Sequence, residues 1–129
     1  MIVDSHQHFW NPDQVYYSWL VPAYGPIYRT FEPAELAPQL EAAGVERTVL
    51  VQSACNFEDT EAMLAQAAEH EWIGAVVGWV PLYAHKLAEN ALGRYVENRW
   101  LKGVRHIKHE EASPGGIVYS EVLAAVHSL

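Results

Sequence analysis

Four short apolar runs, each followed by a longer stretch, are the feature that most constrains the fold of this chain. The runs are apolar throughout instead of alternating with polar residues, which is typical of parallel strands covered on both faces. Parallel strands need long crossovers, and the intervening stretches have the length and spacing of helices. We therefore expect an α/β protein of about four βα units. Its strands are predicted in Ile2–Trp10, Arg47–Gln52, Ile73–Val80 and Lys102–Ile107, and its helices in Glu32–Ala43, Glu58–Trp72, Ala84–Trp100 and Ser120–Leu129.

Two architectures fit this order, an open doubly wound sheet and the first half of a (β/α)₈ barrel. A dinucleotide-binding domain of the first kind carries a glycine-rich phosphate loop after its first strand, and the sequence has none there. A barrel builds its site at the carboxyl ends of its strands. Polar or aromatic residues occur at each of those ends, which favours the barrel; they are His6 and His8, Gln52, Trp79, and Arg105 or His106.

The first run contains two histidines separated by one residue, in IVDSHQHFW. Side chains alternate along a strand, so Asp4, His6 and His8 are predicted to share one face. Two imidazoles whose Cα atoms lie roughly 7 Å apart can lean onto a shared ion or one substrate oxygen. Asp4 is expected to brace one of the rings or a nearby backbone amide. The alternative is a pair of hydrogen-bonded core histidines.

Four local features carry expectations of their own. The aromatic stretch from Asn11 to Phe31 is predicted to be a long loop, either a lid or binding loop or a segment packed against the fold. Pro38 predicts a kink in the first helix or a later start. Asp59 or Thr60 is expected to cap the second helix. The inward residues of the third helix are predicted to be Leu87, Leu92, Tyr95 and Val96.

Composition narrows the class of protein. A formal net charge of −8 and a pI near 5.2 argue against nucleic acid and anionic membranes as partners. The single cysteine, Cys55, excludes an internal disulfide framework and fits a reducing compartment. No apolar run approaches the ~20 residues of a membrane span, and polar residues interrupt any signal peptide. We expect one domain, residues 1–129, in the cytoplasm.

A family resemblance rests on five motifs in order. VDSHQHFWNP, YSWL, TVLVQSA, VVGWVPL and KGVRHI together resemble the amidohydrolase-related family of metal-dependent hydrolases, and within it the sugar-lactone hydrolases of the fuconolactonase and rhamnonolactonase type. The resemblance covers essentially the whole chain and implies a (β/α)₈ barrel. A complete barrel needs about 250 residues, so this chain is expected to form its N-terminal half. The family's further site residues, a histidine and an aspartate near the last strand, have no counterpart among these motifs.

The resemblance implies hydrolysis of a small-molecule sugar lactone. His6 and His8 would be the catalytic pair, stabilising the oxyanion that develops as water attacks the ring carbonyl, directly or through a divalent metal ion such as zinc. A carboxylate from the second half would take the proton from water. Two histidines are fewer than the three protein ligands of a usual catalytic zinc site. No organic cofactor is expected.

The remaining strand-end residues are candidates for substrate binding. Gln52 can hydrogen-bond a sugar hydroxyl or simply fill the strand end. Trp79 can form an apolar wall for a sugar ring or pack in the core. Arg105 and His106 are adjacent, so only one can face the barrel axis; we favour Arg105 as the contact to a substrate oxygen or carboxylate, with His106 as the alternative.

Two other interpretations stay open. One is a related decarboxylase acting on an aromatic or unsaturated acid, and the other is a non-catalytic half-barrel module. A half barrel exposes two strand edges and apolar faces, which favours self-association. We therefore expect the isolated chain to be inactive or to form a homo-oligomer through those edges.

Overall fold

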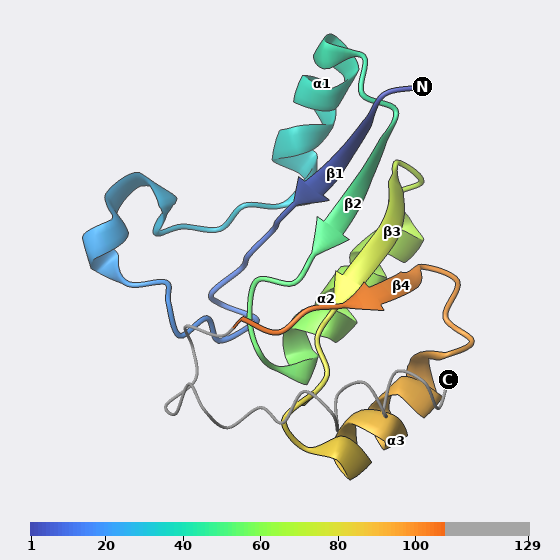
Figure 1. Ribbon diagram of the computed structural model, residues 1–129. Helices are drawn as coiled ribbons and strands as arrows, with labels where there is room; N and C mark the ends of the chain where they lie inside the picture. The colour runs from blue at the N-terminus through green and yellow to red at the C-terminus, as the bar shows by residue number, and fades with distance from the viewer. Residues whose placement is uncertain (108–129) are drawn as a thin grey trace.

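Four parallel strands form one sheet in the computed structural model, which describes residues 1–107 (Figure 1). The predicted helix Ser120–Leu129 lies outside the described residues. The strands are β1 (Val3–Gln7), β2 (Arg47–Val51), β3 (Ile73–Gly78) and β4 (Leu101–Val104). The helices are η1 (Pro22–Ile27, a 3₁₀ helix), α1 (Pro33–Ala43), α2 (Phe57–Glu69) and α3 (His85–Tyr95).

The order of the strands decides between the two architectures. In a doubly wound sheet the strand order reverses at a switch point. Here each strand pairs in parallel with the one before it in the chain, in the order β1-β2-β3-β4. Each pairing also contains a register shift, an irregularity that bends a sheet. In a (β/α)₈ barrel each strand likewise pairs in parallel with the strand that precedes it in the chain.

Helices α1 and α2 lie where the sequence predicts them, with differences at their ends. Helix α1 begins at Pro33, whose fixed φ suits a first helical position, and Gly44 ends it with φ +67°. Pro38 lies inside this helix, so the alternative of a later start is wrong. Helix α2 is not capped by either predicted residue. Its cap is Asn56, whose Oδ1 accepts a hydrogen bond from the backbone N–H of Asp59 at 2.9 Å.

Helix α3 is shorter than predicted, and its inward face is narrower. It ends at Tyr95 because the chain turns at Asn98, whose N–H donates to the Tyr95 carbonyl at 2.8 Å. Leu92 and Tyr95 are buried as predicted, whereas Leu87 and Val96 are 60% and 62% exposed and do not face inward. No helix within residues 1–107 is long and apolar enough to cross a membrane.

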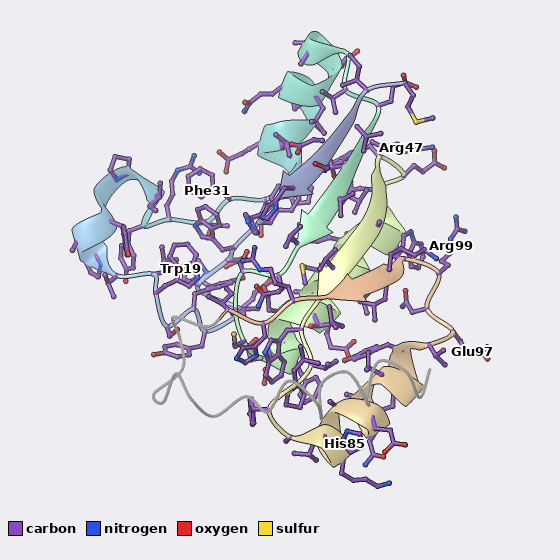
Figure 2. All side chains as sticks on the ribbon, in the orientation of Figure 1. Trp19, Phe31, Arg47, His85, Glu97 and Arg99 are labelled. Atoms are coloured by element: carbon purple, nitrogen blue, oxygen red, sulfur yellow. The ribbon has the colours of Figure 1, made fainter. Side chains whose placement is uncertain are left out.

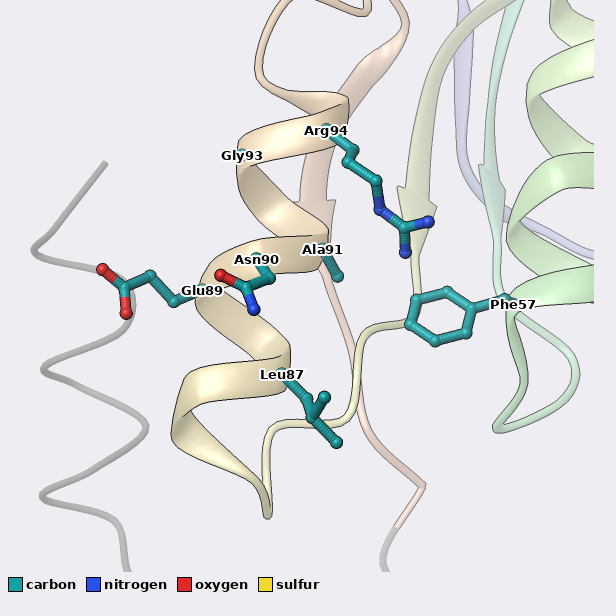
Figure 3. A pocket seen from close by; sticks show the side chains of 7 residues that line it. All are labelled: Phe57, Leu87, Glu89, Asn90, Ala91, Gly93 and Arg94. Atoms are coloured by element: carbon teal, nitrogen blue, oxygen red, sulfur yellow. The ribbon is translucent and has the colours of Figure 1, made fainter.

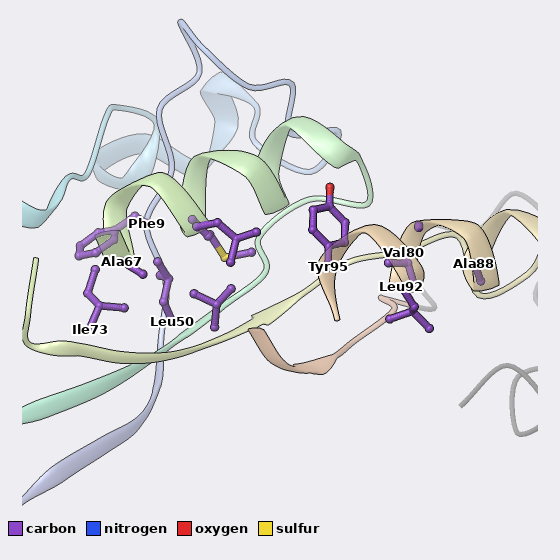
Figure 4. Packing of buried hydrophobic residues seen from close by; sticks show 12 residues of the cluster. Phe9, Leu50, Ala67, Ile73, Val80, Ala88, Leu92 and Tyr95 are labelled. Atoms are coloured by element: carbon purple, nitrogen blue, oxygen red, sulfur yellow. The ribbon is translucent and has the colours of Figure 1, made fainter. Parts of the chain in front are cut away.

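The main core lies between the sheet and helices α2 and α3 (Figure 4). Because side chains alternate along a strand, the neighbours of these core residues point to the other face of the sheet. There Val49, Ala75 and Val77 are only half-buried. The buried residues of the helix-covered face include Leu50, Ile73 and Val76 from the strands, Met63, Leu64 and Ala67 from α2, and Ala88, Ala91 and Leu92 from α3.

The aromatic loop between β1 and α1 is partly packed and partly exposed. Tyr17 and Leu20 are buried with Ala54 in a second core cluster. An antiparallel bridge between Trp10 and Phe31 closes the base of the loop, which reaches away from the sheet (Figure 2). Packing therefore accounts for part of the loop, and a role as a lid stays a prediction. The exposed rings are those of Tyr16, Tyr24 and Tyr28.

Candidate active site

The two histidines converge at the carboxyl end of β1. Their Nε2 atoms lie 3.0 Å apart and the rings meet edge to face, with centroids 4.8 Å apart. Gln7, between them in sequence, points the other way and accepts a hydrogen bond from the Thr48 hydroxyl at 3.2 Å. Asp4 accepts the backbone N–H of His6 at 3.0 Å, so it braces an amide as expected. The predicted shared face is therefore present.

Hydrogen bonding sets the tautomer of His8. Its Nδ1 lies 2.8 Å from the Val51 carbonyl oxygen, which can only accept, so Nδ1 carries the proton. Burial lowers the pKa of His8 below 6.5, the Val51 hydrogen bond opposes this shift, and the charges of Arg105 and His6 add to it. Neutral His8 therefore directs the lone pair of Nε2 toward His6.

Arg105 completes the cluster from the other end of the described sheet. The predicted strand over 102–107 ends at Val104, so Arg105 follows β4 directly. Its NH1 lies 3.2 Å from the Nε2 of His6, and its Nε donates to the Oε1 of Gln52 at 2.9 Å. A guanidinium can only donate, so His6 Nε2 is an acceptor and also carries a lone pair. His6 Nε2 thus lies between His8 Nε2 and the positively charged guanidinium of Arg105, and its lone pair accepts from NH1.

The side chains of this cluster provide only some of the ligands that a metal ion needs. Neutral imidazole nitrogens suit zinc and similar ions, and the hydrogen bond from His8 Nδ1 to a carbonyl is the usual way to orient such a ligand. His6 could bind an ion through Nε2 only by giving up its hydrogen bond from Arg105. Residues 1–107 contain no group of three or more histidine, cysteine, aspartate or glutamate side chains that could hold a metal ion. His6 and His8 can therefore supply two ligands, and other protein ligands would have to come from outside the described residues.

Gln52 and Arg105 are brought together, whereas Trp79 and His106 form a separate pair. Gln52 is 0% exposed. The indole Nε1 of Trp79 donates to the Nδ1 of His106 at 3.1 Å, and Trp79 packs edge to face on Phe57 with ring centroids 5.3 Å apart. The two adjacent residues after β4 thus point to different partners, Arg105 to His6 and His106 to Trp79. Substrate contacts by any of these side chains stay predictions.

Asp59 was missed as a residue that shapes the edge of the site. It is buried in the first turn of α2, and its Oδ2 accepts the backbone N–H groups of Ser53 and Ala54 at 2.8 and 3.0 Å. These bonds hold the chain directly after Gln52. The sequence offers one signal for this role, an acidic residue in the first turn of a helix.

One sizeable hollow lies away from the histidines. It has a volume of about 620 Å³ and is lined by the start of α2 and the outer side of α3, where Arg94 stands over the Phe57 ring at 5.2 Å (Figure 3). It contains no histidine and no aspartate. A smaller pocket of about 270 Å³ borders His8, between β1 and α1.

Comparison with known proteins places the chain in a family. Residues 3–127 match the amidohydrolase family, and the chain belongs to it. Two curated relatives are L-fucono-1,5-lactonases. The one from Burkholderia ambifaria is 44% identical over 62% of this chain and 28% of its own length. The one from Burkholderia multivorans is 36% identical over 85% of this chain and 36% of its own length.

Two crystal structures of an amidohydrolase from Burkholderia multivorans have the same fold. One holds zinc and matches with a TM-score of 0.79 at 32% identity, and the other holds HEPES and matches with 0.81 at 30%. Each match covers 100% of this chain and 45% of the other. The four parallel strands of residues 1–107 and the helices between them thus correspond to the start of a TIM-barrel amidohydrolase, as the sequence predicts. The chain spans less than half the length of these relatives.

Proposed function

We propose that this chain contributes the first part of the active site of a hydrolase that opens a sugar-derived lactone, with L-fucono-1,5-lactone as the first substrate to test. The single observation that carries the proposal is the meeting of His6, His8 and Arg105 at the carboxyl edge of a parallel sheet. Barrel enzymes carry out their chemistry at that edge. The substrate class is supported by the two curated relatives, which are both lactonases.

The described residues can each take a separate role in ester hydrolysis. His6 and His8 would hold a divalent cation, which when bound polarises a carbonyl oxygen as a Lewis acid. Val51 keeps the His8 ring in the orientation and tautomer that this requires. NH1 of Arg105 donates to His6 in this structure. A cation bound to His6 would release NH1, which would then donate to the carbonyl oxygen as negative charge develops on it. We assign the removal of a proton from the attacking water to a carboxylate outside residues 1–107.

Lactone hydrolysis tests the proposal directly. The release of acid from L-fucono-1,5-lactone would be followed for the 129-residue chain and for any longer form of the gene product, with and without added zinc. We expect His6→Ala and His8→Ala each to lower kcat/KM by about 100-fold or more, because each removes a group beside the reacting carbonyl.

His70→Ala is the matched control. His70 follows α2, where its ring packs against Trp72, and the next strand, β3, begins three residues later. It therefore lies at the amino edge of the sheet, opposite the site, and its loss should leave turnover unchanged. Wild-type turnover in His6→Ala would show that the histidine pair does not serve this reaction.

A further inference from the structure

The Arg105 side chain is held mainly by one residue. Its Nε donates to Gln52 Oε1 at 2.9 Å, and its NH2 reaches the Gln52 backbone oxygen at 3.4 Å. The remaining nitrogen, NH1, points to His6 Nε2 at 3.2 Å. Two sides of the guanidinium are thus bound to Gln52, and this leaves NH1 directed at the histidine pair.

Gln52 is itself held firmly. It is fully buried directly after β2, and its backbone N–H donates to the Val77 carbonyl at 2.8 Å. Its side-chain Nε2 donates to the Ala54 carbonyl at 3.0 Å, which directs Oε1 toward Arg105. Both ends of the amide are therefore used inside the protein, and a sugar hydroxyl could reach Gln52 only by displacing one of these bonds.

We propose that Gln52 is a positioning residue that fixes the guanidinium of Arg105 against the histidine pair. An arginine side chain at the surface samples many rotamers, and anchoring Nε selects those that bring NH1 to His6. A donor already placed where charge develops does not have to reorganise during the reaction. The expected effect of Gln52 on catalysis rests on the proposed function. The positioning of Arg105 by Gln52 does not depend on that function.

The positioning is tested on the 129-residue chain by NMR. The Nε–H signal of Arg105 is identified by its absence in Arg105→Lys, and its exchange with water is compared with that of the exposed Arg99. We expect exchange at least about tenfold slower at Arg105, because its partner oxygen is buried and the hydrogen bond is charged. Gln52→Leu should abolish this protection, and Gln52→Glu, which keeps an acceptor oxygen, should preserve it.

Thr48→Val controls for general damage to β2. Thr48 on β2 is as deeply buried as Gln52, which follows that strand directly, but its hydroxyl bonds to Gln7. Protection that survives in Gln52→Leu, or that is lost equally in Thr48→Val, would overturn the proposal.

Lactone turnover supplies the second readout. Gln52→Leu should lower kcat by about tenfold with little change in KM, the size expected for one misplaced charged hydrogen bond. In an Arg105→Met background the same substitution should have no further effect, because Gln52 acts through Arg105. Equal losses in both backgrounds would contradict the inference. If neither the 129-residue chain nor a longer form of the gene product opens the lactone, the proposed function fails, and the NMR comparison still decides whether Gln52 positions Arg105.

Discussion

The hydroxyl of Tyr17 is buried in the loop between β1 and α1, where it accepts the Asn11 backbone N–H at 3.1 Å. Burial raises its pKa from 10.0 to about 12; the Asn11 hydrogen bond opposes this shift, and the charge of Asp59 adds to it. In the unfolded chain the phenol loses its proton near pH 10. Tyr17 therefore contributes stability that is fully present below pH 10 and is lost as the pH rises toward 12.

We predict that Tyr17→Phe weakens the alkaline loss of stability between pH 10 and 12. Urea unfolding at several pH values in this range measures the change in the free energy of unfolding. Tyr95, whose pKa burial also raises to about 12, stays in the variant and should retain part of the effect. An identical pH slope in wild type and variant would show that Tyr17 ionises in the folded protein as it does in the unfolded chain.

At the scale of elements, helix α2 is tied to the end of β3 by Thr60. Its hydroxyl accepts the Trp79 N–H at 2.8 Å and donates to the Trp79 carbonyl at 3.0 Å. The preceding residue, Gly78, leaves little room: a Cβ there would lie 3.0 Å from side-chain atoms of both Thr60 and Leu101. The absence of a side chain at this position thus permits the close approach of helix and strand.

We predict that Gly78→Ala lowers the free energy of unfolding by about 1–3 kcal/mol, because the added methyl group overpacks a tight contact. Gly93→Ala is the matched control, since its Cβ meets nothing within 4 Å on α3. It should raise stability by about 0.5–1 kcal/mol, because alanine is the better helix former. Chemical denaturation of both variants measures the difference. Equal effects at the two positions would show that β3 and α2 can separate without cost.

At the scale of the whole molecule, the sheet has two ends. Within residues 1–107, β1 pairs only with β2, and β4 pairs only with β3. Each of these strands therefore presents one row of backbone groups that the described sheet does not use, and the face opposite the helices carries half-buried apolar residues. Such edges are templates for pairing with another chain.

We predict that the 129-residue chain self-associates with rising concentration, which sedimentation velocity would detect. Val3→Lys should weaken the association, because a charge on an edge strand disfavours pairing. Val3 is 47% exposed on β1, and Val96→Lys at the exposed end of α3 changes the net charge equally without touching the sheet. A monomer at every concentration would contradict the prediction, as would equal effects of the two lysines.

Much of the fold could be predicted because it follows from patterns among residues that are close together in the sequence. Strand and helix positions follow from the spacing of apolar residues, and the sharing of a face by His6 and His8 follows from the alternation of a strand. The bracing of a nearby amide by Asp4 has the same origin. These features involve residues a few positions apart, so the sequence by itself determined them.

The remaining features depend on residues distant in the chain, and only the tertiary structure decided them. Arg105 bonds to Gln52 across 53 positions and to His6 across 99, so its position beside the histidine pair depended on how the sheet brings the chain after β4 to the ends of β2 and β1. The exposure of Leu87 depended in the same way on how α3 sits against the sheet. Local patterns specify which elements form, whereas the contacts between them are set by packing and by the pairing of buried polar groups.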